Sequence, residues 1–221
     1  MKKAIVLLSG GLDSTVTAYY AINKGFIIKA LTINYGQLHD VEISKATATA
    51  DILNIEHIIL PVSLPWKGSA LLDKSIPLPK NRNIKSENKI PSTYVPARNT
   101  IFLSIALSWA EVVEADAIFI GANQVDYSGY PDCRKEYFQC LQDAFVLGTK
   151  KGVEGKPVQI NTPLLELDKK DIILLGSKLN VPFENTWSCY NGGNVPCCSC
   201  DSCLIRKKGF REANISDPLL S

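Results

Sequence analysis

The stretch LLSGGLDSTV, residues 7–16, decides the fold of the N-terminal part of this chain. An apolar run stops at Ser9, two glycines follow, and Asp13 and Ser14 lead into further apolar residues. This order predicts a buried strand, a tight turn and the start of a helix. The first amides of a helix have no partner within it and carry partial positive charge, so the turn is suited to an anion.

The residue types in the turn indicate which anion it binds. Gly10 and Gly11 present no Cβ, so the backbone can curl and an anion can approach closely. The hydroxyls of Ser9 and Ser14 can donate to phosphate oxygens. A phosphate-binding loop is therefore predicted. The alternative is a plain strand-to-helix turn in which Asp13 or Ser14 only caps the helix.

Length and composition favour one well-packed globular domain with a small appendage. The chain has 221 residues, of which 46% are hydrophobic, and its formal net charge is only +2. Such a balance argues against a surface that coats nucleic acid. No apolar run approaches the ~20 residues of a membrane span. The N-terminal apolar run is also shorter than that of a signal peptide, so a cytoplasmic protein is expected, with no membrane and no direct nucleic-acid partner.

Strand patterns alternate with helix patterns along the chain. Strands are expected at 3–9, 26–34, 57–62, 117–121 and 158–160, and helices at 14–23, 41–53, 99–113, 135–147 and 169–179, with Asp168 as an N-cap. Residues 65–97 carry five prolines and little periodicity, which indicates a long loop. The alternation predicts an α/β fold, a parallel sheet flanked by helices, with ligands at the carboxyl ends of the strands.

Five of the seven cysteines lie within residues 189–203. Cys189, Cys197, Cys200 and Cys203 have the number and C-x-x-C spacing of a closed tetrahedral zinc site, and such a site is structural. Cys198 adjoins Cys197 and is expected to point elsewhere. Two alternatives remain: a redox-active C-x-x-C pair at a helix start after a strand, and an iron–sulfur cluster.

Two other phosphate-binding motifs are absent. The P-loop pattern G-x-x-x-x-G-K-[ST] fails because Gly155-Lys156 is followed by Pro157, and G-x-G-x-x-G does not occur. The sequence SGGLDS instead resembles the pyrophosphate loop of the N-type ATP pyrophosphatases, or PP-loop enzymes. That resemblance implies cleavage of ATP between the α- and β-phosphates and transfer of AMP to a substrate oxygen.

Further segments extend the resemblance over nearly the whole chain. They are YGQLH at 35–39, YVPARNTIFLSIALSWAE at 94–111, DYSGYPDCR at 126–134, TPLLELDKKDI at 162–172 and the cysteine region from TWSCYNGG to CSCDSC. In this order they resemble the 7-cyano-7-deazaguanine synthases of queuosine biosynthesis. The one departure noted is Cys198, where the resemblance leads us to expect glycine.

The resemblance implies an ATP-dependent ligase that forms carbon–nitrogen bonds. Its substrates would be ATP, ammonia and 7-carboxy-7-deazaguanine, and its product the 7-nitrile. A carboxylate resists attack because its leaving group would be oxide, so adenylation must precede ammonia. The amide oxygen must leave as well, which requires a second adenylation. One site that adenylates oxygen could perform both steps, chiefly by positioning and charge stabilisation.

These considerations define the expected site residues. For ATP they are Leu8, Ser9, Gly10, Gly11, Leu12, Asp13, Ser14, Thr15, Val16, Thr17 and Ala18, with Mg²⁺ on the triphosphate. Asp13 could help to place the metal or could only cap the helix or brace the loop. For the substrate they are Arg98, Asp126, Tyr127, Tyr130 and Asp132. Arg98 could meet either a phosphate or the substrate carboxylate, aspartate can accept from a guanine-like edge, and tyrosine can stack. The alternatives are a surface ion pair and a polar loop. His39 could be a base for ammonium or a helix-start hydrogen bonder.

Two other functions stay open at this level. A PP-loop enzyme that thiolates tRNA would need a catalytic thiol near the loop and an RNA-binding surface. A zinc-ribbon module for nucleic acid would explain the C-terminal cysteines but not the phosphate loop. The expected organisation is a PP-loop domain over residues 1–180, with a zinc-binding element over 181–221 that holds one zinc ion. A homodimer is possible by analogy.

Overall fold

A five-stranded parallel sheet organises the molecule. The computed structural model describes residues 1–38, 40–81, 90–125 and 129–220. The strands are β1 Lys3–Leu7, β2 Ile27–Asn34, β3 His57–Pro61, β4 Ala117–Ile120 and β5 Gln159–Asn161, in the order β3-β2-β1-β4-β5. All neighbours are parallel, as the alternation of strand and helix patterns predicts.

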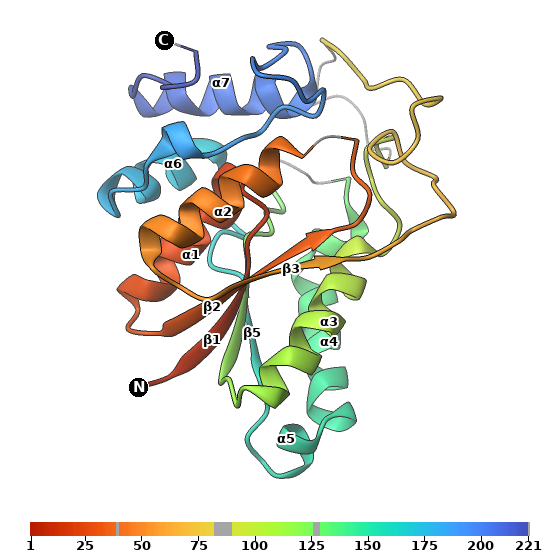
Figure 1. Cartoon of the computed structure of the whole chain (residues 1–221), viewed down its shortest axis with the longest axis vertical. Helices are drawn as coiled ribbons and strands as arrows, with labels where there is room; N and C mark the ends of the chain where they lie inside the picture. The colour runs from red at the N-terminus through yellow and green to blue at the C-terminus, as the bar shows by residue number, and fades with distance from the viewer. Residues whose placement is uncertain (39, 82–89, 126–128, 221) are drawn as a thin grey trace.

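Helices cover both faces of this sheet (Figure 1). The first five are α1 Leu12–Asn23, α2 Val41–Leu53, α3 Arg98–Val112, α4 Lys135–Gly148 and α5 Lys150–Val153. They are followed by α6 Lys169–Lys178 and α7 Asp201–Ala213, and two short 3₁₀ turns are η2 Pro131–Cys133 and η3 Phe183–Asn185. Helices α1 and α2 lie on one face of the sheet and α3 and α4 on the other.

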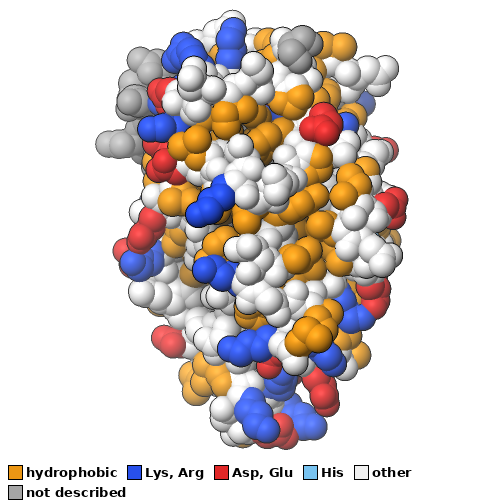
Figure 2. Space-filling model, turned by 90° about the vertical axis from the view of Figure 1, so that its left-hand side faces the viewer, with side chains coloured by type: hydrophobic (Ala, Val, Ile, Leu, Met, Phe, Trp, Pro, Cys, Tyr) orange, Lys and Arg blue, Asp and Glu red, His pale blue; other side chains and the backbone are white. Residues whose placement is uncertain are grey.

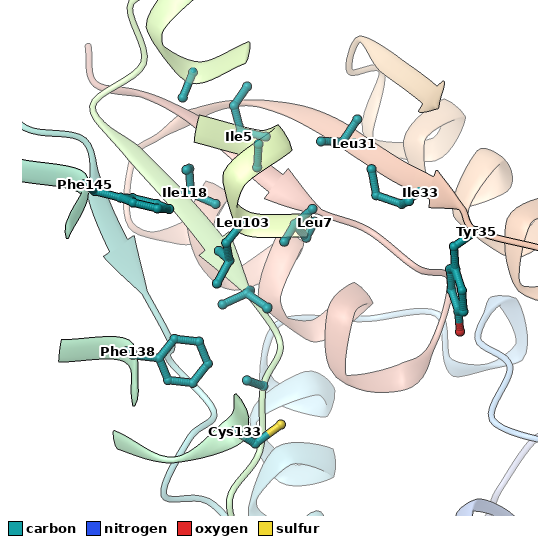
Figure 3. Close-up of a cluster of buried hydrophobic side chains, with 14 of the residues drawn as sticks. Ile5, Leu7, Leu31, Ile33, Tyr35, Leu103, Ile118, Cys133, Phe138 and Phe145 are labelled. Atoms are coloured by element: carbon teal, nitrogen blue, oxygen red, sulfur yellow. The ribbon is translucent and has the colours of Figure 1, made fainter. Parts of the chain in front are cut away.

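The alternation of side chains along β1 explains the two cores. Ala4 and Val6 pack with α1 and α2, whereas Ile5 and Leu7 face the opposite cluster under α3 and α4. Figure 3 shows Ile5 and Leu7 beside Leu103, with Phe138 and Phe145 completing that cluster. Because both faces are covered, the central strands are apolar on both sides.

Most expected elements are confirmed within one or two residues of their ends. Asp168 caps α6 as predicted, since its Oδ1 accepts from the amide of Asp171 at 2.8 Å. The described part of the 65–97 segment has no named helix or strand, but Lys80 forms an isolated antiparallel bridge with Cys200. Helix α7 is the main element that the sequence patterns did not predict.

The C-terminal region packs against the first helix and the phosphate loop. Phe183, Phe210 and Ala213 share a buried cluster with Leu12 and Val16 of α1. The amide of Trp187 donates to the carbonyl of Gly10 at 2.9 Å. Residues 181–220 therefore add to the wall around the loop, and the division at residue 180 stays a prediction. Over the described ranges, no helix is both long and apolar enough to cross a bilayer.

Candidate active site

The turn after β1 has the geometry of an anion site at the switch point of the sheet. The chain winds from β1 outward to β3 and returns to β4 on the other side of β1, which places the carboxyl ends of β1 and β4 at that point. Helix α1 begins at Leu12, and the amide of Thr15 makes the bond to the carbonyl of Gly11. The amides of Leu12, Asp13 and Ser14 precede that bond, so they have no carbonyl within the helix.

Serine side chains hold the turn in shape. The hydroxyl of Ser14 donates to the carbonyl of Gly11 at 3.0 Å and accepts from the amide of Ser9 at 3.1 Å. The hydroxyl of Ser9 accepts from the amide of Gly11 at 3.2 Å. Gly121, after β4, comes so close to α1 that a Cβ there would lie 2.9 Å from the backbone of Asp13. The end of β4 thus packs directly against the first turn of α1.

A cavity of about 240 Å³ opens over this turn. Of the predicted ATP residues, the first part of the loop lines it: Leu8, Ser9, Gly11, Leu12, Asp13 and Ser14. Thr15, Val16, Thr17 and Ala18 are fully buried behind it, and Gly10 is buried against α2. Their part in binding ATP stays a prediction, and their positions indicate that they support the loop.

Asp13 is held by a lysine that the sequence analysis did not identify. Lys169, at the start of α6, donates to both carboxylate oxygens of Asp13 at 2.6 and 2.8 Å, and its side chain is 9% exposed. This geometry favours a bracing role for Asp13 over direct metal binding. Lys169 lies within the TPLLELDKKDI segment and lines the cavity beside the loop.

The lining of the cavity also includes an arginine among phenols. Arg98 begins α3, donates to the hydroxyl of Tyr35 at 3.2 Å and lies 5.8 Å from the centre of that ring. Burial acts to lower the pKa of Arg98, but the phenols of Tyr35 and Tyr130 outweigh it, and the guanidinium stays charged. Tyr130 also lines the cavity, and its hydroxyl is 2.7 Å from that of Thr93.

Of the remaining predicted substrate and catalytic residues, the structure describes only Asp132. Asp132 is buried at the start of α3, where its Oδ2 accepts from the amide of Asn99 at 3.1 Å, and it is not among the residues that line the cavity. This position indicates a capping role, and substrate contact by Asp132 stays a prediction. Asp126, Tyr127 and His39 lie outside the described residues.

Glu42 is a further acid in the cavity that sequence reasoning missed. It belongs to the first turn of α2, and its side chain is half-buried and faces the cavity. Burial raises its pKa to about 7, although the charge of Arg98 acts in the opposite direction. A carboxyl with such a pKa can exchange a proton near neutral pH. Its position in YGQLHDVE, directly after a strand end, was the available signal.

Among the described residues that line the cavity, Cys133 carries the thiol group. Burial raises its pKa to about 12, and Asn99 donates to its sulfur at 3.4 Å. A nucleophilic cysteine needs a lowered pKa. The thiolation alternative therefore finds no suitable thiol in this wall.

Four cysteines come together beside the cavity, as predicted. The sulfurs of Cys189, Cys197, Cys200 and Cys203 all lie within 4.8 Å of one another. A tetrahedral site with Zn–S bonds of about 2.3 Å needs sulfurs about 3.8 Å apart, and those of Cys197 and Cys203 are 4.0 Å apart. The four residues could hold one metal ion.

The surroundings of the four cysteines bear on whether Cys200 and Cys203 form a redox-active pair. Hydrogen bonds from Cys200 and Cys203 lower the pKa of Cys189, and the amides of Cys197 and Asn191 act in the same direction. Cys200 is the N-cap of α7, so its C-x-x-C does open a helix, as a redox pair would. Only an isolated bridge precedes it, however, and a redox pair leaves three nearby cysteines unexplained.

Cys198 is turned away from the cluster. It is exposed, and its sulfur donates to the carbonyl of Pro196 at 3.4 Å. Its φ of +57° lies in the left-handed region, which explains why glycine suits this position.

Comparison with known proteins identifies the family. The family model of the queuosine biosynthesis protein QueC matches residues 3–214. The chain belongs to this family. Its relatives include proteins named 7-cyano-7-deazaguanine synthase from Thermoplasma volcanium and Thermosynechococcus vestitus, each 51% identical. The alignments cover 99% of this chain in both cases, and 90% and 95% of the two relatives.

Solved structures of similar fold include more distant proteins. A predicted subunit of tRNA methyltransferase from Methanocaldococcus jannaschii matches with a TM-score of 0.50 at 20% identity, over 80% of this chain and 75% of that one. NMN synthetase from Francisella tularensis gives 0.50 at 15% identity, over 97% and 87%. At such identities the likeness concerns the fold alone.

Proposed function

We propose that this chain converts 7-carboxy-7-deazaguanine and ammonia into 7-cyano-7-deazaguanine, with ATP cleaved to AMP and pyrophosphate. The observation that carries the proposal is the full-length match to the QueC family, with relatives of that name at about 50% identity. The cavity supports it, because anion-binding amides and a charged arginine face the same space.

The chain's own residues have distinct parts in this proposal. The amides at the start of α1 and the hydroxyls of Ser9 and Ser14 bind the phosphates, with Lys169 supplying positive charge beside them. Arg98 binds the substrate carboxylate. Tyr130, which lines the same cavity, would stack on the ring system of the base. Mg²⁺ arrives with ATP and neutralises phosphate charge.

The acid must be activated twice. Its carboxylate oxygen attacks the α-phosphate and displaces pyrophosphate; ammonia then displaces AMP and leaves an amide. The amide oxygen is adenylated in turn, and loss of AMP and of both nitrogen-bound protons gives the nitrile. Alignment of the oxygen with the α-phosphate supplies most of the catalysis.

The zinc assignment belongs to the same proposal. Cys189, Cys197, Cys200 and Cys203 would hold one zinc ion, whose closed coordination makes it structural.

A homodimer, a cytoplasmic location and the absence of nucleic-acid partners also remain proposals. On the face shown in Figure 2, acidic and basic side chains are interspersed around a broad hydrophobic area.

The test is a reaction with purified protein, the deazaguanine acid, ATP, Mg²⁺ and ammonium. Mass spectrometry should find the nitrile, and nucleotide analysis should find two AMP for each nitrile. The amide supplied alone with ATP should also yield nitrile, with one AMP. Stoichiometric ADP, or failure of the supplied amide to react, would contradict this scheme.

A further inference from the structure

Glu42 and Arg98, which carry opposite charges when ionised, line the same cavity without forming an ion pair. The carboxylate of Glu42 accepts no hydrogen bond from any described residue, and Arg98 makes no ion pair within the described ranges. Both side chains are half-buried and line the cavity, so each can be matched by a bound group of opposite charge. We therefore expect Glu42 and Arg98 each to bind a separate substrate group of opposite charge.

The proposed reaction has two charged co-substrates that need such partners. The acid is an anion and fits Arg98, whereas ammonia reaches the enzyme at neutral pH mainly as ammonium, a small cation. Glu42 provides the matching anion. We propose that Glu42 is the ammonium-binding residue of this site, an inference that rests on the proposed function.

The position of Glu42 places ammonium near the reacting carbon. The carbonyl of Glu42 packs so tightly on the phosphate loop that a Cβ at Gly10 would lie 1.9 Å from it. The first turn of α2 is therefore fixed to the loop that binds the phosphates. A nucleophile held there approaches a carbon whose leaving group is the α-phosphate.

Amide formation starts from ammonium held at Glu42 and the acyl adenylate. Ammonium gives one proton to Glu42, and the freed nitrogen lone pair attacks the carbonyl carbon of the acyl adenylate. A carbon–nitrogen bond forms, the bond from that carbon to the phosphate-bearing oxygen breaks, and AMP leaves with the electron pair. The nitrogen loses its second proton to solvent, which leaves the neutral amide.

Other acids fit this role less well. Asp13 is already paired with Lys169, and Asp132 is bound to the backbone at the start of α3. Among the described residues that line the cavity, Asp13 and Glu42 are the acidic ones. Glu42 could instead bind magnesium or the amino group of the base. Either of these roles would serve both acid-to-amide and amide-to-nitrile conversion, whereas ammonium binding serves only the first.

The experiment compares Glu42→Gln with wild type in each half-reaction. Conversion of acid to amide requires ammonium, whereas conversion of supplied amide to nitrile does not. We expect the KM for ammonium to rise about 10- to 100-fold, as loss of a charged hydrogen bond predicts. The KM values for ATP and amide, and the rate of nitrile formation from amide, should stay within about twofold of wild type.

Two further variants complete the design. Asp51→Asn, an exposed acid on the same helix, should leave every parameter unchanged. Glu42→Asp keeps the charge and should recover part of the ammonium affinity. If Glu42→Gln does not fold, the KM for ammonium and the rate of nitrile formation from amide are compared in Glu42→Asp instead. Equal losses in both halves, or an unchanged KM for ammonium, would overturn the proposal. A wild-type protein that makes no amide would instead refute the proposed function, and the ammonium role with it.

Discussion

Gly10 and Gly11 are adjacent in the loop but differ in what they allow. Gly10 has a φ of +85°, and a Cβ there would collide with the carbonyl of Glu42. Gly11 has a φ of −72°, and a Cβ there would come no closer than 3.2 Å to its nearest neighbour, the hydroxyl of Ser9. Gly10→Ala should lower the free energy of unfolding by about 2 kcal/mol or more. Gly11→Ala should cost at most about 1 kcal/mol but reduce ATP affinity about tenfold.

Urea denaturation and calorimetry with ATP measure the two effects. Full stability in Gly10→Ala would show that the loop does not rest on α2. An unchanged ATP affinity in Gly11→Ala would show that the phosphates bind elsewhere.

Cys198 offers a prediction at a single strained position. Its left-handed φ costs about 1 kcal/mol for a residue with a Cβ, and its sulfur lies outside the cluster. Cys198→Gly should therefore gain about that much stability and keep one zinc ion per chain, whereas Cys200→Ser should lose the metal. Elemental analysis of the purified variants checks this. Loss of zinc from Cys198→Gly would mean that the second ligand is misassigned.

The raised pKa of Glu42 makes stability depend on pH. Burial raises it from 4.5 to about 7, so between these values the folded state binds more protons than the unfolded state. Stability due to this group is then lost as pH rises through that window. Glu42→Gln should be more stable than wild type at pH 8 and nearly equal to it at pH 4.5. Denaturation at both pH values tests this, and Asp51→Asn should show no such gain.

At the scale of elements, hydrophobic periodicity predicted the sheet and most helices but not α7. That helix buries polar residues, Ser202 and Arg206, beside Phe210, so its apolar stripe is interrupted. Arg206 is buried because it makes a two-bond pair with Asp217, at 2.8 and 2.9 Å, and donates to Thr186 at 2.8 Å. Such a pairing depends on residues outside the helix, which a local pattern does not reveal.

The Arg206–Asp217 pair should fix α7 in place. Both side chains are 5% exposed, so removal of one charge leaves the other buried and unpaired. Asp217→Asn should cost about 3–5 kcal/mol of unfolding free energy. Glu212→Gln breaks an exposed pair with Lys208 on the same helix and should cost at most about 0.5 kcal/mol. Chemical denaturation compares them, and equal effects would show that burial does not decide the contribution.

At the scale of the molecule, the cavity joins segments that are distant in sequence. The loop and the four cysteines were predictable because each carries its chemistry within a short motif. Glu42, Lys169 and Arg206 were missed because a lone charged residue on a helix is usually at the surface, and only the packing of α2, α6 and α7 brings them to the cavity. Arg98 and Tyr130 were predicted from the resemblance, but the charged residues that complete the cavity wall required the fold.

The four-cysteine cluster packs close to the phosphate loop, although the two are distant in sequence. Removal of the metal should therefore affect the loop. Trp187 packs on Cys189 and Cys200 and donates from its backbone amide to Gly10, so one residue links the cluster to the phosphate turn. Structural zinc contributes on the order of 10 kcal/mol of folding free energy in small sites. A strong chelator should therefore lower the melting temperature and weaken ATP binding together, and added zinc should restore both. Thermal unfolding and calorimetry on the same samples follow the two properties. ATP affinity that survives complete loss of metal would show that the wall formed by residues 186–203 holds its shape without the ion.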